Sequence, residues 1–191
     1  MIHDSGVLTR WHAALLQAFG LEAAALRVLD QRCEKHPLDA ETRARRTHLL
    51  ALAGAWPAAL ADSERLLAQR PDSAAAWFNH GYLLDRCGHW AEARSAFERA
   101  TRLDPQLDRA WYGLGLALIR QGQLEEAAAA LTRNTALQPL SPYGWYQLAR
   151  VQVDLEQTDA ALQSLQRLKA FDRRVAAQLM QDTGLTMHAE A

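Results

Sequence analysis

The sequence has few cysteines and none of the short motifs that mark common enzyme sites. Only two of its 191 residues are cysteines, and Cys33 and Cys87 lie far apart without a CxxC spacing. We interpret them as reduced helix residues, because redox and metal-binding cysteines are usually closely spaced. The sequence also lacks a GxxxxGK[ST] loop, a GxGxxG motif, a GxSxG motif and a histidine pair at i and i+4 with a glutamate. These absences predict a protein that is not an enzyme and that uses no metal or cofactor.

The histidines are the remaining candidates for a reactive group. His80, Asp85 and Cys87 are close in sequence, but at i+5 Asp85 points well round a helix from His80. No oxyanion donor is evident beside them, and a nucleophilic centre needs one. We therefore expect the histidines to be structural and buried or half-buried.

The chain also lacks a charge imbalance and a long apolar run. It has 21 Lys and Arg against 22 Asp and Glu, so the chain as a whole has no electrostatic reason to prefer nucleic acid or an anionic membrane. No segment approaches the roughly 18 apolar residues that indicate a membrane span. Asp4 and Arg10 stand where a signal peptide would be apolar. We expect a cytoplasmic protein that binds neither nucleic acid nor membrane.

What the sequence does contain is an internal repeat of 34 residues. Four residue types keep one register along the chain, which leaves little room for coincidence. They are Trp77, Trp111 and Trp145; Pro37, Pro71, Pro105 and Pro139; Gly20, Gly54, Gly88 and Gly122; and Ala25, Ala59, Ala93, Ala127 and Ala161. The register predicts five units, at residues 6–39, 40–73, 74–107, 108–141 and 142–175.

Each unit has the pattern of two antiparallel helices. In the third unit Trp77, Gly81 and Leu84 fall on one face of a helix, at i, i+4 and i+7, and Gly88 ends that helix. A second helix follows and stops at Pro105. Small residues at the eighth and twentieth positions of a unit let the two helices approach closely, and the tryptophan at the fourth position fills the space beside that contact. The pattern predicts an all-α protein.

These features resemble the tetratricopeptide repeat family, and the resemblance runs from residue 6 to residue 175. The third and fourth units fit best, through Trp77, Gly81, Leu84, Ala93, Phe97, Ala100 and Pro105 in the third and Trp111, Leu114, Gly115, Leu118, Ala127, Leu131 and Pro139 in the fourth. The resemblance implies a right-handed α-solenoid of antiparallel helix pairs. It also implies that the first helices line a concave groove that holds other proteins.

The first two units depart from the pattern, because Thr9 and Arg43 stand at the fourth position in place of tryptophan. The terminal repeat of a solenoid is commonly atypical, since one of its faces meets water. This explanation covers the first unit and leaves the second unexplained.

The second unit instead carries an arginine cluster, Arg43, Arg45 and Arg46, on a helix whose counterparts elsewhere are apolar at the core positions. One interpretation is structural: the long side chains cover the neighbouring hairpin while their head groups reach Glu34, Asp30 or solvent. The other interpretation is functional, a basic patch that binds an acidic segment of a partner.

At the C-terminal end, Arg173 replaces the proline that closes earlier units, so the last helix can continue or kink near Asp172 before Gly184 ends it. We expect residues 176–191 to form a helix that caps the apolar edge of the fifth unit, with a frayed tail from residue 186. The alternative is that this edge dimerises. The sequence thus predicts a monomer or a weak homodimer.

A partner is expected on the side of each first helix that the core does not use. Aromatic side chains and arginines gather there, and these residue types dominate binding energy at protein interfaces. The predicted site residues are Phe78, Asn79, Tyr82, Arg109, Tyr112, Tyr143, Tyr146 and Arg150. The first two units, with Ala44 and His48 at these positions, offer a poorer surface. The alternative is that residues such as Tyr112 and Tyr146 are ordinary scaffold residues of the resembled family.

One activity of the resembled family does not fit this sequence. Tetratricopeptide domains that grip the C-terminal carboxylate of heat-shock chaperones use a set of five lysine, asparagine and basic positions. In the second to fourth units Asn79 and Arg109 match this set, whereas Ala44, His48 and Gly113 do not. We do not expect this carboxylate clamp.

The sequence therefore predicts an adaptor or scaffold that captures an extended peptide or a short amphipathic helix in the groove of the third to fifth units. In this hypothesis the aromatic residues are apolar anchors, Asn79 holds the ligand backbone, and Arg109 and Arg150 pair with acidic groups. Two alternatives stay open. One is a dedicated secretion or assembly chaperone for one client, and the other is a self-assembling structural module.

Overall fold

The computed structural model describes residues 6–186, and every regular element in this range is an α-helix. The chain divides into two compact units, an N-terminal unit that ends at His89 and a C-terminal unit that begins at Trp90. The N-terminal unit contains α1 (Gly6–Ala18), α2 (Glu22–Lys35), α3 (Ala40–Leu52), α4 (Trp56–Gln69) and α5 (Ala74–Arg86). The C-terminal unit contains α6 (Trp90–Leu103), α7 (Asp108–Arg120), α8 (Leu124–Leu137), α9 (Pro142–Asp154), α10 (Thr158–Phe171) and α11 (Arg173–Thr183).

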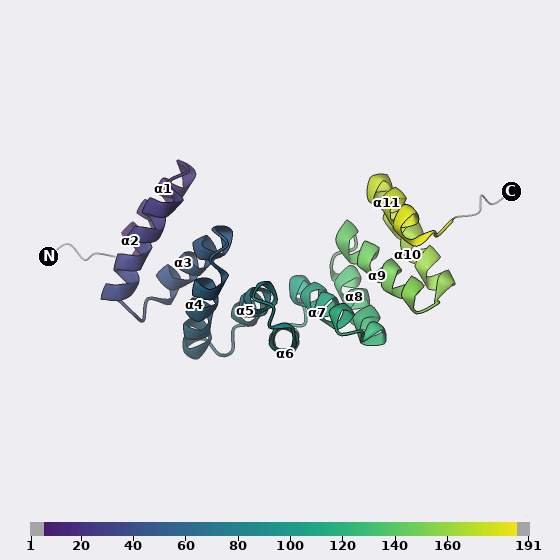
Figure 1. Ribbon diagram of the computed structural model, residues 1–191, viewed down its shortest axis with the longest axis horizontal. Helices are drawn as coiled ribbons and strands as arrows, with labels where there is room; N and C mark the ends of the chain where they lie inside the picture. Colours follow the sequence, from purple (N-terminus) through teal and green to yellow (C-terminus); the bar gives the residue numbers. More distant parts are fainter. Residues whose placement is uncertain (1–5, 187–191) are drawn as a thin grey trace. The chain divides into compact units, whose positions relative to one another are not determined.

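Consecutive helices lie side by side within each unit (Figure 1). In the N-terminal unit α1 packs on α2 and α3 on α4, while in the C-terminal unit α7 packs on α8 and α9 on α10. The boundary between the units falls inside the predicted repeat 74–107, because its helices α5 and α6 belong to different units. The division of the chain into five equal repeats therefore stays a prediction.

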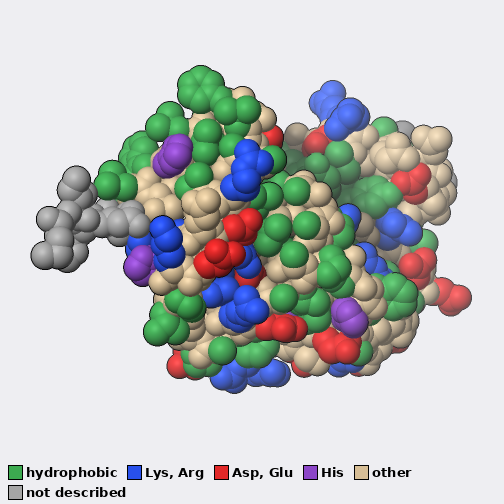
Figure 2. Space-filling model, turned by 60° about the vertical axis from the view of Figure 1, so that its left-hand side comes forward, with side chains coloured by type: hydrophobic (Ala, Val, Ile, Leu, Met, Phe, Trp, Pro, Cys, Tyr) green, Lys and Arg blue, Asp and Glu red, His purple; other side chains and the backbone are tan. Residues whose placement is uncertain are grey.

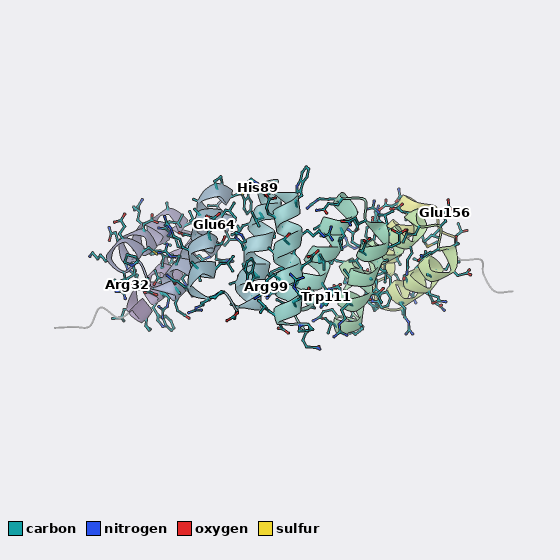
Figure 3. All side chains as sticks on the ribbon, turned by 90° about the horizontal axis from the view of Figure 1, so that it is seen from below. Arg32, Glu64, His89, Arg99, Trp111 and Glu156 are labelled. Carbon is teal, nitrogen blue, oxygen red and sulfur yellow. The ribbon has the colours of Figure 1, made fainter. Side chains whose placement is uncertain are left out.

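A left-handed turn ends the first helix of each pair. The four glycines of the 34-residue register have φ values of 70°, 73°, 84° and 71°, which a residue without a Cβ adopts at little cost. The fifth position of this series is occupied by Glu156, with a φ of 60°. It lies in the turn after α9, where Figure 3 labels it. A side chain in this conformation costs roughly 1–2 kcal/mol, so one turn of the C-terminal unit is strained.

Side-chain caps fix where several helices begin. Asp39 and Ser73 cap α3 and α5 by accepting hydrogen bonds from the backbone N–H three residues further on, at 3.0 and 3.2 Å. Ser141 precedes α9 in the equivalent place but makes no side-chain capping hydrogen bond. Pro142 follows it within the first turn of the helix, and its ring presets φ for that turn.

The tryptophans at the fourth position tie each first helix to the turn before it. The indole Nε1 of Trp77, Trp111 and Trp145 donates to the carbonyl oxygen of the proline six residues earlier, at 2.7, 3.0 and 2.9 Å. The rings are half-buried, so each contributes apolar area at one end and a hydrogen bond at the other. Trp111 is labelled on α7 in Figure 3. This hydrogen bond is a physical reason for proline and tryptophan to share one register.

Small residues allow the helices of a pair to approach closely, as the pattern predicts. A Cβ added to Gly115 on α7 would lie 2.7 Å from Cγ of Leu131 on α8, well inside van der Waals contact. Ala127 and Leu131 are both fully buried. The C-terminal unit thus has an apolar core in which glycine and alanine set the spacing between helices.

The last helix is separate from the one before it. The backbone leaves the helical region at Asp172, with φ −137° and ψ 87°, and the Asp172 carboxylate accepts a hydrogen bond from the Val175 N–H at 3.0 Å. Gly184 ends α11 in a left-handed conformation. Leu179 and Leu185 join the core that α9 and α10 form, so α11 covers this apolar face. The frayed tail is predicted from residue 186, and residues 187–191 of it lie outside the described residues.

Candidate functional site

A hollow of about 400 Å³ opens between α3, α4 and α5 of the N-terminal unit. Three of the predicted site residues, Phe78, Asn79 and Tyr82, line it together from α5. The rest of its lining consists of Ala44, Thr47, His48, Ala51, Ser63, Leu66, Arg70, Ser73, Ala75, Ala76 and Leu83. The volume falls in the range of roughly 300–1,000 Å³ that is usual for ligand sites.

One wall of the hollow comes from α3. Ala44, His48 and Ala51 lie on this wall, although the sequence predicts that the repeat 40–73 is a poorer binding surface than the later repeats. The alanines are important because their short side chains leave the volume that a ligand would fill. The signal that could have found this wall is the pairing of small residues on one first helix with large aromatic residues on the next.

Aromatic contacts hold the Tyr82 ring at the edge of the hollow. The ring is 44% exposed and meets Trp56 of α4 edge-on, with 6.3 Å between ring centroids. The Arg86 guanidinium lies 4.5 Å from the centroid of the same indole, a cation–π contact. Tyr82 is therefore exposed to a ligand while its orientation is restricted, which lowers the entropy lost on binding.

The polar pair beside the hollow is structural. The Ser63 hydroxyl donates to the Leu60 carbonyl at 2.7 Å, so the Nδ1–H of His80, at 2.8 Å from Ser63 Oγ, is the donor in that contact. Burial lowers the pKa of His80 and raises the pKa of the Cys33 thiol. Within residues 6–186 no group of three or more His, Cys, Asp or Glu side chains could hold a metal ion. Neither Ser63 nor Cys33 is activated as a nucleophile.

The other five predicted residues belong to the C-terminal unit, with Arg109 and Tyr112 on α7 and Tyr143, Tyr146 and Arg150 on α9. Tyr112 is half-buried and hydrogen-bonds to Gln147 of α9, and burial raises the pKa of its hydroxyl. Tyr143 is 68% exposed. The structure thus groups the predicted residues into two sets, one in each unit, and we treat them as two candidate sites.

The last helix engages two of these five residues, which the sequence did not reveal. The Tyr146 hydroxyl donates to the Asp182 carboxylate of α11, and this hydrogen bond raises the pKa of Tyr146. The Arg150 guanidinium lies 5.9 Å from the centroid of the Tyr146 ring. Tyr146 and Arg150 therefore help to seat α11, while Arg109, Tyr112 and Tyr143 form the remainder of this face.

The arginine cluster surrounds one buried carboxylate. Asp62 of α4 has a side chain that is 1% exposed, and it accepts from Nη1 of Arg43 at 3.1 Å and from Nε and Nη2 of Arg46 at 2.6 and 2.7 Å. Arg46 also donates to Asp30 at 3.1 Å, and Arg45 donates to the Arg10 backbone carbonyl at 3.0 Å. These are the internal contacts of the structural interpretation, with Asp62 as the main acceptor. A partner-binding role for Arg43, Arg45 and Arg46 remains a prediction.

Arg43 also takes the place of the missing tryptophan. Its Nη2 donates to the Pro37 carbonyl oxygen at 2.6 Å, and Pro37 is again the proline six residues earlier. The same backbone acceptor is thus satisfied by a guanidinium in α3 and by an indole in α5, α7 and α9. The predicted repeat 40–73 therefore makes the same hydrogen bond as the later repeats, with an arginine in place of the tryptophan.

Residues 79–142 match the family model of the tetratricopeptide repeat. The sequence has no significant match among the curated proteins. Outside residues 1–5 and 187–191, which the structure does not describe, no helix is long and apolar enough to cross a membrane.

Solved structures resemble the chain over most of its length. MamA from Desulfovibrio magneticus RS-1 is 23% identical, with 91% of this chain and 98% of that chain covered and a TM-score of 0.81. PilW, described as a widely conserved type IV pilus biogenesis factor, is 20% identical, with 95% and 87% covered and a TM-score of 0.78. YrrB, described as a TPR protein with an unusual peptide-binding site, is 18% identical, with 91% and 90% covered and a TM-score of 0.76. At these identities the likeness concerns the fold.

Residues 79–142 therefore match the tetratricopeptide repeat family, and the chain has an all-helical fold of antiparallel helix pairs like that of solved tetratricopeptide repeat proteins. Both the predicted family and the predicted fold class are confirmed. Proteins of this family mediate protein–protein interactions and are generally not enzymes. The fold thus implies a protein as the partner.

Proposed function

We propose that this chain is an adaptor whose N-terminal hollow captures a short segment of a partner protein. The observation that carries the proposal is the lining of the hollow, in which Phe78 and Tyr82 of α5 and the small residues Ala44 and Ala51 of α3 border one space of about 400 Å³. Aromatic side chains supply large contact area for few lost rotamers, which makes them effective anchors. A segment with one or two bulky apolar side chains fits such a space.

Polar groups around the hollow favour an extended or helical peptide over a small apolar molecule. Asn79 is exposed on the lining, and its amide can both donate to and accept from a peptide backbone. Arg70 lines the hollow and pairs with Glu41 at 3.5 Å on the surface. An exposed pair of this kind is weak, so an acidic group on the partner can compete with Glu41 for Arg70. We infer a partner segment with apolar anchors and some acidic character.

The face of α7 and α9 supplies a second contact in this proposal. Tyr143 is well exposed and Tyr112 is half-buried beside it, and Arg109 is exposed at the start of α7. Aromatic residues next to an arginine suit the same chemistry as the hollow, an apolar anchor with an acidic neighbour. The peptide-binding site named in the description of YrrB supports the general use of this fold for peptide capture.

A variant that fills the hollow tests this proposal. Ala51→Trp places a large side chain in the hollow, whereas Leu52→Trp changes a neighbouring residue that is 63% exposed and lies outside the lining. A photo-reactive side chain at Asn79 would identify the bound segment in a native lysate, and a synthetic copy of that segment would then be titrated. We expect Ala51→Trp to weaken binding by about tenfold or more, with Leu52→Trp close to the parent.

Two results would overturn the proposal. The first is equal binding of the segment by both tryptophan variants, with circular dichroism showing that both are folded. The second is cross-linking from Asn79 that does not exceed cross-linking from a solvent-facing position such as Leu140. An adaptor is expected to yield segments from several proteins, whereas a dedicated chaperone yields one client.

A further inference from the structure

The first helix carries an apolar face that the described part of the chain leaves uncovered. We call this face the α1 stripe, and it consists of Val7, Leu8, Trp11, Leu15 and Phe19. Their exposed fractions are 50%, 59%, 67%, 54% and 75%. The spacing of 8, 11, 15 and 19 places them along one side of the helix and its final turn. In Figure 2 hydrophobic side chains gather at the upper left of the view, over the start of the N-terminal unit.

The register of the repeat indicates that this face is a surface for docking a helix. The residues that follow Leu15 at intervals of 34 are Leu49, Leu83, Ala117 and Val151, and all four are buried. They lie on α3, α5, α7 and α9, which pack against α2, α4, α6 and α8. Only α1 lacks such a preceding helix among residues 6–186. Leu15 thus occupies a position that is buried in the four later first helices, but among the described residues no preceding helix covers it.

The size of the α1 stripe suits a specific interface. Trp11 and Phe19 alone have side chains of about 150–250 Å² each, and the three aliphatic residues are at least half exposed. A face of several hundred Å² exceeds what single, scattered surface residues provide. It also approaches the roughly 800 Å² per partner of a standard protein interface.

The absence of charge on the α1 stripe points to a second copy of this chain as its occupant. Arg10 is the only Lys, Arg, Asp or Glu residue in α1. It pairs with Asp39 of its own unit at 3.7 Å. Two such helices can therefore meet without placing like charges together. The order of side chains is also nearly the same in both directions. In an antiparallel pair whose midpoint lies at the level of Ala13, which is itself buried against its own unit, Trp11 lies opposite the second copy's Leu15, and Val7 lies opposite its Phe19.

We propose that the α1 stripe forms a symmetric antiparallel dimer contact between two copies of this chain. The contact leaves the hollow of each copy free, because no residue of α1 lines it. A dimer would present two hollows to one partner, which raises the effective concentration of the second site. The proposal does not depend on what the hollow binds.

Sedimentation equilibrium of the full chain tests the dimer. We expect the parent to show a concentration-dependent monomer–dimer equilibrium in the micromolar range. Leu15→Glu places a carboxylate in each half of the contact and is expected to weaken association by roughly a hundredfold. Leu140→Glu is the matched control, since Leu140 is 73% exposed on the C-terminal unit, and it should associate like the parent.

Disulfide trapping tests the direction of the helices. In a Cys87→Ser background, a mixture of Trp11→Cys chains and Leu15→Cys chains is expected to cross-link more efficiently than either variant alone. The proposal is overturned if the parent stays monomeric up to several hundred micromolar, or if Leu15→Glu and Leu140→Glu associate equally. A monomeric parent that sediments with phosphatidylcholine–phosphatidylglycerol vesicles through Trp11 and Phe19 would assign the stripe to a lipid surface instead.

Discussion

The residues at 40–73 and those at 108–141 build similar helix pairs from opposite chemistry. In α7 and α8 the fourth, seventh and twenty-third positions are Trp111, Leu114 and Ala130, whereas in α3 and α4 they are Arg43, Arg46 and Asp62. Both pairs bury these positions wholly or in part. The first set fills space with apolar side chains, and the second fills it with a charged network. In both pairs the residue at the fourth position also donates a hydrogen bond to the carbonyl of the proline six residues earlier, so the comparison suggests the hypothesis that either chemistry can support this helix pair.

The two solutions differ in how a single change affects them. An apolar core loses area in proportion to what is removed. A buried charged network is all-or-none, because removing one partner leaves the other charge buried and unpaired. A single substitution is therefore expected to lower the free energy of unfolding more in the α3–α4 pair than in the α7–α8 pair.

The largest effect is expected from Asp62→Ala. Asp62 is the acceptor for both Arg43 and Arg46, and its loss leaves two guanidinium groups without their main partner. We expect the free energy of unfolding to fall by about 3–5 kcal/mol, measured by urea unfolding followed by circular dichroism. Glu64→Ala, on an exposed residue of the same helix, is the control. A loss of under about 1 kcal/mol for Asp62→Ala, within the range of exposed pairs, would contradict the network.

The next effect is expected from Trp111→Ala in the apolar pair. This change removes a half-buried ring and the hydrogen bond to Pro105, and we expect a loss of about 3 kcal/mol. Trp111→Phe keeps an aromatic ring but removes the hydrogen bond and part of the indole, so it should cost about 1 kcal/mol for the hydrogen bond and less in total than Trp111→Ala. Equal losses for the two variants would show that the ring itself contributes little.

A smaller effect of opposite sign is expected from Glu156→Gly. Glu156 is a non-glycine residue with positive φ at the position where the other four turns have glycine. The substitution removes that strain but adds freedom to the unfolded chain, so we expect a net gain of up to about 1 kcal/mol. Differential scanning calorimetry measures it, with Glu156→Ala as the control that keeps the Cβ. A lower melting temperature for the glycine variant would mean that the turn is not strained.

The smallest effect is expected on the pH dependence of stability. It involves His80 of α5, whose Nδ1 lies 2.8 Å from the Ser63 hydroxyl of α4. Burial lowers the pKa of His80 in the folded state below its ordinary value of 6.5. The unfolded chain therefore binds the proton more readily, and the stability from neutral His80 is full above pH 6.5 and is lost as pH falls through the folded pKa. We expect His80→Gln to flatten the dependence of melting temperature on pH below that value. An unchanged slope would show that His80 does not cause the pH dependence of the melting temperature.

Much of the fold could be predicted from sequence because the repeat encodes it locally. Gly88 ends a helix, Pro105 stops another, and Trp77 and Leu84 share a face, so each element follows from a few residues at fixed spacing. The tryptophan–proline hydrogen bond could not be predicted from periodicity, because it depends on how the turn aims one carbonyl group.

The sequence predicted only some of the acidic partners of the arginine cluster. Asp30 was anticipated as an acceptor for an arginine, but Asp62 is the main one. A signal was present, since Ala96 and Ala130 occupy the positions equivalent to Asp62. A charge at a core position of one helix, together with opposite charges at core positions of its partner, indicates a pair.

The candidate site was predicted in part. Phe78, Asn79 and Tyr82 line one hollow, because residues on one helix face reach the same space. The contact of Tyr146 with Asp182 was missed, because α11 turns back after Asp172 and packs on α9 and α10. The direction in which a chain turns back after a helix is not set by the pattern within that helix.

The most direct measurement is urea unfolding of a triple variant that gives α3 and α4 the residues of α7 and α8, Arg43→Trp, Arg46→Leu and Asp62→Ala. If the charged network only replaces an apolar core, the variant should fold with the same helical content and be as stable as the parent or more stable by about 1–4 kcal/mol. A loss similar to that of Asp62→Ala alone would show that the two chemistries are not interchangeable in this fold.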